Sequence, residues 1–268
     1  MKFASYSFLV AILLLIGCKE KINIQVADRD PILVVEGEVT TEADSSYVRL
    51  SLSTNYFVAG KPPIVNNATV NVNGVNFAFV PSQSLYRPAK GYLGKTDSIY
   101  NLSINYNNKT YSASTKLERM FKIDSFFQTW KEAEPPFLPS GYSVSYSAFD
   151  SRPQTKYTYF VNGYFDTITQ RDSFGGNQIL FDNSFTPINE RYVFEIPFAR
   201  FNAGDEYIAI FRSIDRNMND FIAAYGNQNP NIPGPFQVPP ANLPTNIVGG
   251  AVGYFAGYDV QRWRYRVK

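Results

Sequence analysis

The stretch Ala68-Thr69-Val70-Asn71-Val72-Asn73-Gly74-Val75-Asn76-Phe77-Ala78-Phe79 decides the class of fold. Apolar side chains recur at every second position on both sides of Asn73-Gly74, and this dipeptide is the strongest short signal for a two-residue hairpin turn. The same alternation runs through residues 47–53 and 100–106. A period of two residues is typical of a half-buried strand and argues against a helix. About seven short strands with such spacing are typical of a β-sandwich. The sequence therefore predicts an N-terminal β-sandwich over residues 31–118.

The second half of the chain continues this pattern. Five further segments rich in Tyr, Phe, Val and Ile favour pleated, half-buried strands: residues 121–130, 142–149, 157–164, 191–197 and 207–212. The sequence therefore predicts a C-terminal β domain over residues 119–268. The fold class expected for the whole chain is all-β, with two β-sandwich domains and one short helix in the second.

That helix is the one segment that departs from the strand pattern. Four apolar residues are spaced i, i+3, i+4 and i+7, which is the apolar face of a helix: Met218, Phe221, Ile222 and Tyr225. The helix is expected to begin after Asp215 or Asn217 as its N-cap and to end at Gly226 as its C-cap.

The start of this helix has a second interpretation. Residues 215–220 have the Asp-x-Asn-x-Asn spacing of a calcium loop. They lack the glycine at the sixth position and the bidentate glutamate at the twelfth that such a loop needs. Helix capping explains the pattern better, so no metal site is expected.

The beginning of the chain has the order of a secretory signal. Lys2 precedes an apolar run too short to span a bilayer as a helix, which takes about 20 residues. Leu15-Ile16-Gly17-Cys18 resembles the bacterial lipobox, in which the cysteine is lipidated and becomes the first mature residue. We therefore expect residues 1–17 to be a lipoprotein signal peptide, Cys18 to carry lipid in the outer membrane, and residues 18–30 to form a tether. A plain signal peptide with a chance cysteine is the alternative.

Composition narrows the chemistry. The 268 residues contain no His and one Cys, which excludes a Ser-His-Asp triad, a Cys-His pair and histidine-ligated zinc. With 25 Lys and Arg against 23 Asp and Glu, the chain lacks the basic excess of a nucleic-acid-binding protein. Carboxylate-pair hydrolysis, a Ser-Lys arrangement and oxygen-ligated calcium remain chemically open, and no cofactor is expected.

Aromatic residues are the candidate ligand-binding or partner-binding groups. Tyr and Trp stack on sugar rings and anchor protein interfaces. The candidates are Trp130, Tyr142 and Trp263, with Phe137 beside them. The alternative is that these rings belong to the core, as most of the 19 Tyr and 22 Phe must.

Gly249, Gly250 and Gly253 form a glycine-rich motif near the end of the chain. Glycine tolerates positive φ and lets another strand or another chain approach closely. A tight turn between strands is the simpler expectation, because the strand-glycine-helix context of a dinucleotide loop is absent.

A series of short motifs runs in a fixed order through residues 31–260. They are Leu33-Val34-Val35-Glu36-Gly37, Pro62-Pro63 with Ala68-Thr69-Val70, Gly94-Lys95 before Tyr100-Asn101-Leu102-Ser103-Ile104, Ile123-Asp124-Ser125, Tyr157-Thr158-Tyr159-Phe160, Gly204-Asp205, and residues 246–255. In this order they resemble a family of Bacteroidetes lipoproteins known as domain of unknown function 4249. The proline pair and the strand after it also resemble the entry of carboxypeptidase-regulatory-like and Ig-like modules, with a Pro-rich loop entering a strand as the alternative. The two sandwiches are expected to be of Ig-like or transthyretin-like kind.

The resemblance implies a context rather than a reaction. The family has no established catalytic residues, and its members are often encoded beside TonB-dependent receptors. Lys19-Glu20 partly matches a signal for export to the cell surface, so surface exposure is expected, with the periplasmic face as the alternative. Ser98 and Thr167 lie in short patterns that Bacteroidetes O-glycosylate, although chance matches to such patterns are common.

The function expected from these observations is that of an outer-membrane lipoprotein and non-enzymatic accessory partner of a TonB-dependent transporter. Its ligand would be a glycan or a peptide. A structural or interaction lipoprotein of the envelope without a small ligand is one alternative. A carboxylate-type glycan hydrolase is the other.

Overall fold

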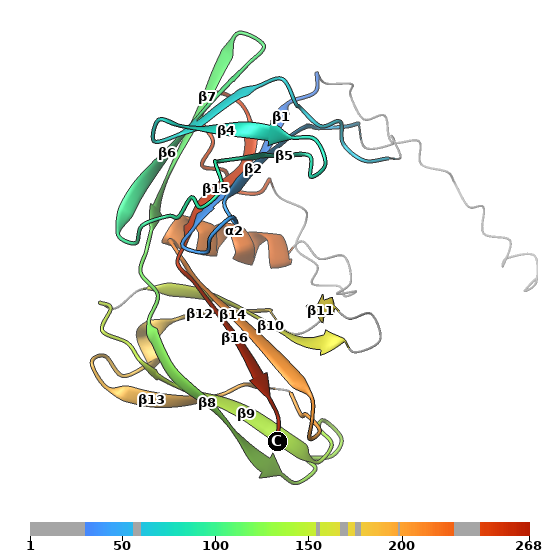
Figure 1. Ribbon diagram of the computed structural model, residues 1–268, viewed down its shortest axis with the longest axis vertical. Coiled ribbons are helices and arrows are strands. Elements are labelled where there is room, and N and C mark those ends of the chain that lie inside the picture. The colour runs from blue at the N-terminus through green and yellow to red at the C-terminus, as the bar shows by residue number, and fades with distance from the viewer. Residues whose placement is uncertain are drawn as a thin grey trace, which may run out of the picture. The chain divides into compact units, whose positions relative to one another are not determined.

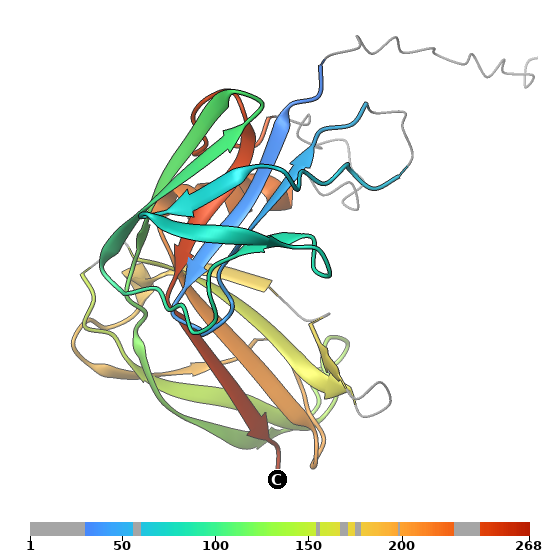
Figure 2. The same ribbon diagram turned by 45° about the horizontal axis from the view of Figure 1, so that its top comes forward.

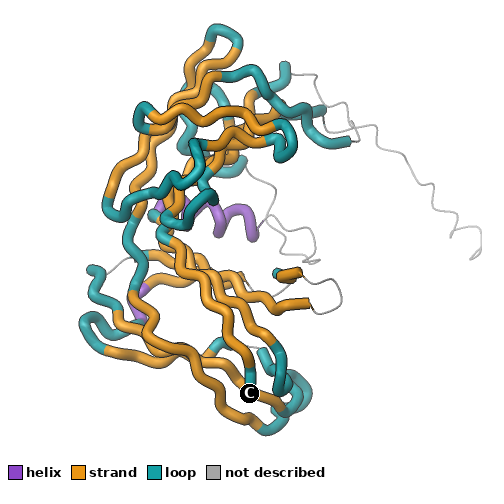
Figure 3. The backbone as a smooth tube through the Cα atoms, viewed as in Figure 1, coloured by secondary structure: helices purple, strands orange, loops and turns teal. Residues whose placement is uncertain are grey.

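The computed structural model describes residues 30–55, 60–153, 156–166, 171–174, 178–197, 199–227 and 242–268 (Figure 1). Within these residues the chain consists of β-strands with one short 3-10 helix and one α-helix (Figure 3). The predicted all-β class is confirmed. The predicted signal peptide, Cys18, nearly all of the tether, and Thr167 lie outside the described residues.

The first sheet contains eight strands, and the predicted hairpin lies within it. Asn73 and Gly74 both have positive φ, 47° and 82°, as a type I′ turn requires. The neighbouring strands follow in the order β15 (Val252–Tyr258), β1 (Leu33–Thr40), β2 (Tyr47–Leu52), β5 (Leu85–Arg87), β4 (Val75–Val80), β3 (Thr69–Val72), β6 (Ser98–Tyr106) and β7 (Lys109–Leu117).

One strand of this sheet comes from near the end of the sequence. β15 pairs in parallel with β1, from Val34 opposite Val252 to Thr40 opposite Tyr258 (Figure 2). The sheet formed by the predicted N-terminal segment is therefore completed by residues from the segment predicted as the C-terminal domain, 119–268. A parallel pairing over such a distance leaves no local turn signal in the sequence.

The two outermost strands, β7 and β15, approach each other through the segment before β15. Ser112 and Val248 exchange backbone hydrogen bonds of 3.1 and 2.7 Å. The Asn246 side chain accepts from Phe255 N (3.0 Å) and donates to Phe255 O (2.7 Å), so it occupies the free edge of β15 as another strand would. The sheet is therefore nearly barrel-like, which protects edges that could otherwise pair with other chains.

The remaining strands form two smaller sheets. A five-stranded sheet has the order β11 (Arg171–Ser173), β10 (Tyr157–Asp166), β14 (Glu206–Ile214) and β16 (Val260–Arg266), with β12 (Gln178–Asp182) also on β10; the 3-10 helix η1 (Asn183–Phe185) follows β12. A three-stranded sheet has the order β13 (Arg191–Glu195), β9 (Gly141–Phe149) and β8 (Lys122–Lys131). Residues of both sheets share one core rich in aromatic rings, among them Tyr146, Phe160, Tyr207 and Phe211.

β15 and β16 carry the chain from the first sheet into the five-stranded sheet. Asp259 alone separates the two strands. Its carboxylate accepts hydrogen bonds from Thr41 Oγ1 and Met120 N, each 2.8 Å long, and its backbone O accepts from Ser213 N (3.0 Å). Residues 118–121 connect β7 of the first sheet to β8 of the three-stranded sheet, and the domain boundary predicted from the sequence lies in this connection.

The α-helix α2 (Arg216–Asn227) confirms the predicted helix. Asp215 is its N-cap, because Oδ1 accepts a hydrogen bond from Met218 N (2.7 Å). Met218, Phe221 and Ile222 pack against a cluster that includes Tyr254 of β15.

Two details of the predicted helix are wrong. Tyr225 is 67% exposed instead of completing the apolar face. Gly226 lies inside α2 and lacks the positive φ of a C-cap. A Cβ at position 226 would meet nothing within 4 Å, so nothing in the packing requires a glycine there.

Candidate functional site

Trp130 and Tyr142, two of the predicted aromatic candidates, lie directly opposite each other on β8 and β9. Their ring centroids are 5.1 Å apart and their planes cross at 80°, the edge-to-face geometry that aromatic rings prefer. Trp130 remains 52% exposed, and its indole Nε1 donates to Glu132 Oε1 (3.2 Å). Two contacts therefore orient an indole ring that is half open to solvent.

The turn between β8 and β9 presents a third aromatic ring. Phe137 is 82% exposed. Glu134 closes the turn by exchanging backbone hydrogen bonds of 2.8 and 3.0 Å with Leu138. Arg200, whose side chain is only 5% exposed, holds the turn through a 2.8 Å ion pair with Glu134. The turn is therefore anchored to the body of the protein while Phe137 stays in solvent.

The three rings of Trp130, Phe137 and Tyr142 are called the aromatic hairpin below. The backbone at Tyr142 is also held by a neighbouring segment. Tyr142 and Phe201 exchange backbone hydrogen bonds of 2.9 Å in both directions. Gly141 favours this contact, because a Cβ at that position would lie 3.1 Å from Phe201 O. Exposed, oriented aromatic rings of this kind suit stacking on a sugar ring or anchoring a protein partner.

The third predicted aromatic residue, Trp263, lies apart from the aromatic hairpin. It is on β16, partly buried against the aromatic core, with its ring centroid 5.3 Å from that of Phe126. The structure therefore brings Trp130 and Tyr142 together and gives Trp263 a packing role. Alternation alone does not distinguish these cases, because it places a ring on one face of a strand without saying what covers that face.

Two residues that support the aromatic hairpin were not predicted. Glu132 has a local signal, since it lies two residues after Trp130. Arg200 has none, because its partner Glu134 is 66 residues away in the sequence. Long-range ion pairs of this kind become visible only once the strands are placed.

The opposite face of the three-stranded sheet carries a charged carboxylate, Glu195 of β13. Glu195 accepts from Ser143 Oγ (2.7 Å) and forms an ion pair with Lys131 (3.1 Å). The hydrogen bond from Ser143, and then the contact with Lys131, hold the pKa of Glu195 below its ordinary value. Glu195 is therefore an anion at neutral pH rather than a proton donor.

The predicted glycine motif serves close backbone packing. Gly253 has φ +112°, and a Cβ there would lie 2.0 Å from Val35 O on the paired strand. Gly249 has φ +108°, and its Cβ would lie 2.8 Å from Thr110 O. Gly250 also has positive φ, +88°, but faces open space. The glycines let β15 and the segment before it approach β1 and β7.

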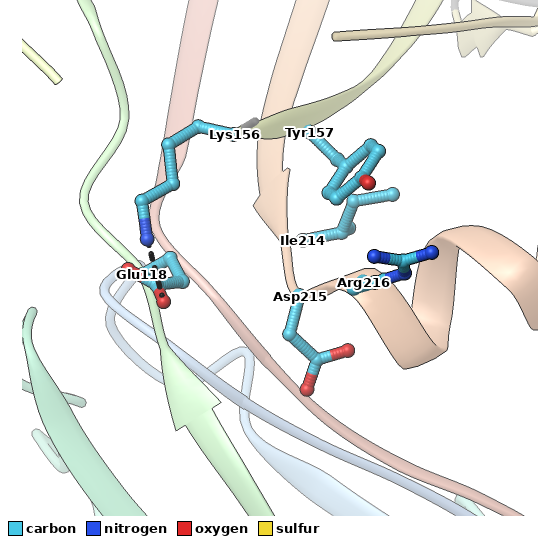
Figure 4. A pocket seen from close by; sticks show the side chains of 6 residues that line it. All are labelled: Glu118, Lys156, Tyr157, Ile214, Asp215 and Arg216. Carbon is cyan, nitrogen blue, oxygen red and sulfur yellow. Dashed lines mark ion pairs between the residues drawn. The ribbon is translucent and has the colours of Figure 1, made fainter. Parts of the chain in front are cut away.

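A small recess lies at the start of α2 (Figure 4). It has a volume of about 190 Å³ and is lined by Glu118, Lys156, Tyr157, Ile214, Asp215 and Arg216. Lys156 forms a 3.0 Å ion pair with Glu118, and the Asp215 carboxylate accepts from Thr115 Oγ1 (3.2 Å). These charges already have partners, so the recess is best explained as the junction of β7, β10 and α2.

Two further observations concern only the part of the chain that the structure describes. There, no group of three or more His, Cys, Asp or Glu side chains is arranged to hold a metal ion. The same residues include no helix long and apolar enough to cross a membrane. Ser98, the predicted glycosylation candidate within the described ranges, begins β6 and is half-buried.

The fold and the aromatic hairpin define an all-β protein with an ordered, solvent-exposed aromatic surface. The chain belongs to the family Domain of unknown function (DUF4249), whose family model matches residues 19–264. The resemblance identified from the order of the sequence motifs is thereby confirmed. Comparisons with curated proteins and with solved structures returned no match.

Proposed function

We propose that this protein is a lipid-anchored outer-membrane lipoprotein, exposed at the cell surface, that binds a ligand or partner without catalysing a reaction. Its partner is a TonB-dependent transporter, and its ligand is a glycan or a peptide. The observation that carries the proposal is the aromatic hairpin, in which Trp130 is half exposed yet oriented by Tyr142 and Glu132. Exposed aromatic rings held in one orientation lose little conformational freedom on binding, which favours affinity.

The lipid anchor is supported by the position of Cys18. It is the single cysteine of the chain and follows an apolar run of signal-peptide length. The family match begins at residue 19, directly after Cys18. A mature chain that starts at a lipidated Cys18 would therefore contain the whole matched domain.

The non-enzymatic part of the proposal is supported by the state of the carboxylates. A carboxylate-type hydrolase needs an acid whose pKa is raised enough to donate a proton. Hydrogen bonds from Arg262 and Arg191 instead lower the pKa values of Glu42 and Asp124. Burial does raise the pKa of Glu38, but this carboxylate is already paired with Arg212 (3.4 Å). These three carboxylates are therefore poor candidates for the proton donor of a glycan hydrolase.

The finer architecture also belongs to this proposal. We infer two β-sandwich domains of Ig-like or transthyretin-like kind. For the second domain, the support is that the five-stranded and three-stranded sheets share one aromatic core. For the first domain, the support is that strands from both halves of the eight-stranded sheet contribute side chains to one buried cluster. A solved structure in which these layers do not face each other would overturn this part.

Two experiments test the proposal. Replacing Cys18→Ala should release the protein from outer-membrane fractions, and retention there would contradict the anchor. In mild detergent, the tagged lipoprotein should co-purify a TonB-dependent transporter, and Trp130→Ala should reduce the recovered transporter at least about tenfold, as loss of an aromatic hot spot does. The matched control is Val193→Ala, which removes a 62% exposed side chain from β13. If the wild-type protein brings down no transporter, the alternative of a structural envelope lipoprotein replaces this one.

A further inference from the structure

An apolar row crosses the outer face of the first sheet at the end where the chain enters it. Val252 of β15 pairs with Val34 of β1, Val34 pairs with Ser51 of β2, and Ser51 forms a bridge with Ile64. Val252 and Ile64 are 38% and 41% exposed. Ile32, two residues before Val34, is 42% exposed. Four apolar side chains, from β1, β15 and the segments that hold Ile32 and Ile64, therefore lie near one another, with Ser51 of β2 between Val34 and Ile64.

The strand geometry directs these side chains away from the core. Leu33 and Val35 are buried in the core of the first sheet, so Ile32 and Val34, which alternate with them, point to the other face. Val65 is likewise buried, which turns Ile64 outward. Ile32, Val34, Ile64 and Val252 are called the apolar row below.

The apolar row has a sharp polar boundary on the side away from the start of β1. The next outward pair along β1 and β2 is Glu36 with Arg49, joined by a 3.2 Å ion pair. Their side chains are 55% and 44% exposed. On β1 and β2 the outer face is therefore apolar where the chain enters the sheet and charged one step further along, whereas on β15 the next outward residue, Tyr254, is buried against α2.

We propose that the apolar row rests on the lipid bilayer to which Cys18 anchors the chain. This inference rests on the lipid anchor of the proposed function. Ile32 is the fourteenth residue after Cys18, and a chain of that length spans at most roughly 50 Å when fully extended. The row is thus the first part of the described fold that the chain reaches after its anchor.

The chemistry of the row suits a membrane interface better than bulk water. Contiguous exposed apolar side chains mark surfaces that contact a membrane or another protein. Lys61, exposed and three residues before Ile64, adds a positive charge of the kind that anionic lipid headgroups attract. Since acyl chains on Cys18 already hold the protein at the bilayer, the row would fix which side of the first sheet faces it.

The test exploits the single cysteine. Once Cys18 carries lipid, a cysteine introduced elsewhere is the only free thiol and takes one fluorescent label. Ile64→Cys and Val252→Cys place the label in the row. Ile99→Cys and Val193→Cys are matched controls, because those side chains are 59% and 62% exposed but lie on β6 and β13. Each variant must first keep the wild-type unfolding curve.

The full lipidated chain is placed in vesicles of phosphatidylethanolamine and phosphatidylglycerol that contain a lipid-borne quencher. We expect quenching at positions 64 and 252 to exceed that at 99 and 193 by at least threefold. Equal quenching at all four positions overturns the proposal. The proposal is also overturned if position 64 is shielded only in membranes that contain a transporter. That result would assign the row to a protein partner. Mass spectrometry of the N-terminal peptide separates the two hypotheses: absence of lipid on Cys18 refutes the anchor itself, whereas lipid with equal quenching refutes only the contact.

Discussion

The first sheet and the two smaller sheets stabilise their cores in different ways. In the first, most buried side chains are Val, Leu and Ile, and the backbone of β15 lies against β1 where Gly253 has no side chain. In the second, the rings of Phe121, Tyr146 and Phe160 surround Phe211 with centroid distances of 5.9, 5.1 and 4.6 Å. The first sheet thus depends on backbone fit and the second on ring packing.

This difference bears on where a binding surface can form. A sheet pair filled with aromatic rings can place further rings at its margin, and the aromatic hairpin continues the ring-rich face of β8 and β9 into solvent. The first sheet is joined by close backbone packing between strands, and the second group of strands presents the aromatic surface.

The largest effect is expected from a substitution that separates β15 from β1. Gly253→Val places a Cβ 2.0 Å from Val35 O at a φ of +112°, so the strands must move apart. We expect a loss of more than about 4 kcal/mol in the free energy of unfolding, or failure to fold. Urea unfolding followed by circular dichroism measures it.

Gly250→Ala is the control for this substitution. Its φ is also positive, +88°, but nothing lies within 4 Å of the added Cβ. The expected loss is the backbone strain alone, about 1–2 kcal/mol. Equal losses for both variants would show that backbone conformation, and not the contact between strands, is what requires glycine in this motif.

The matching test in the second group of strands removes a central ring. Phe211 is fully buried and contacts three other rings at centroid distances of 4.6 to 5.9 Å. Phe211→Ala should lower the free energy of unfolding by about 3–5 kcal/mol, through lost burial and the cavity that remains. Phe127→Ala, at a 37% exposed position of β8, should cost less than about 1 kcal/mol. Similar losses for the two would mean that the ring cluster around Phe211 is not the source of stability.

Asn246 tests how far the first sheet depends on its closure. Its side chain exchanges two hydrogen bonds with the backbone of Phe255, 2.7 and 3.0 Å long. Asn246→Ala leaves both backbone groups without that partner, and we expect a loss of about 2 kcal/mol in the free energy of unfolding. Hydrogen exchange at Phe255 N should speed up in parallel. Asn67→Ala, at an exposed position, should change neither quantity, and a loss there of similar size would remove the argument for closure.

The sequence predicts local features of this molecule well and long-range ones poorly. The Asn73-Gly74 turn, the alternating strands and the cap at Asp215 follow from neighbours within a few residues, and the structure contains them. The pairing of β15 with β1 depends on residues more than two hundred positions apart, and no local pattern encodes it.

The candidate site also has a part that the sequence predicts and a part that only the structure shows. Trp130 and Tyr142 were both candidates, yet only the hairpin register shows that they face each other. Trp263 was an equal candidate, and only its neighbour Phe126 shows that it packs in the core. Residue type indicates which groups are suited to binding, whereas exposure is decided by what the rest of the chain covers.

A smaller effect is expected where the two groups of strands are linked by charge. Arg262 of β16 donates to both carboxylate oxygens of Glu42 (2.9 and 3.4 Å), and these hydrogen bonds lower the pKa of Glu42 from its ordinary 4.5. A carboxyl with a lowered folded-state pKa stabilises the fold above its unfolded pKa and loses that contribution as pH falls through the folded value. Glu42→Gln should therefore cost about 0.5–1 kcal/mol at pH 7, and the difference from wild type should vanish well below pH 4.5. A difference that stays constant down to pH 3 would exclude the ion pair as its cause.

The smallest effect on stability, and the sharpest on function, is expected at Trp130. Its ring is 52% exposed, so Trp130→Ala should change the free energy of unfolding by less than about 1 kcal/mol while reducing transporter recovery in the pull-down. Trp263→Ala reverses the pattern: its ring packs on Phe126, so stability should fall by about 3 kcal/mol while recovery by the folded protein is unchanged. The two tryptophans differ in what surrounds them and not in their chemistry. If both variants lose stability and recovery together, the aromatic hairpin is part of the core, and the ring-filled sheets present no separate surface.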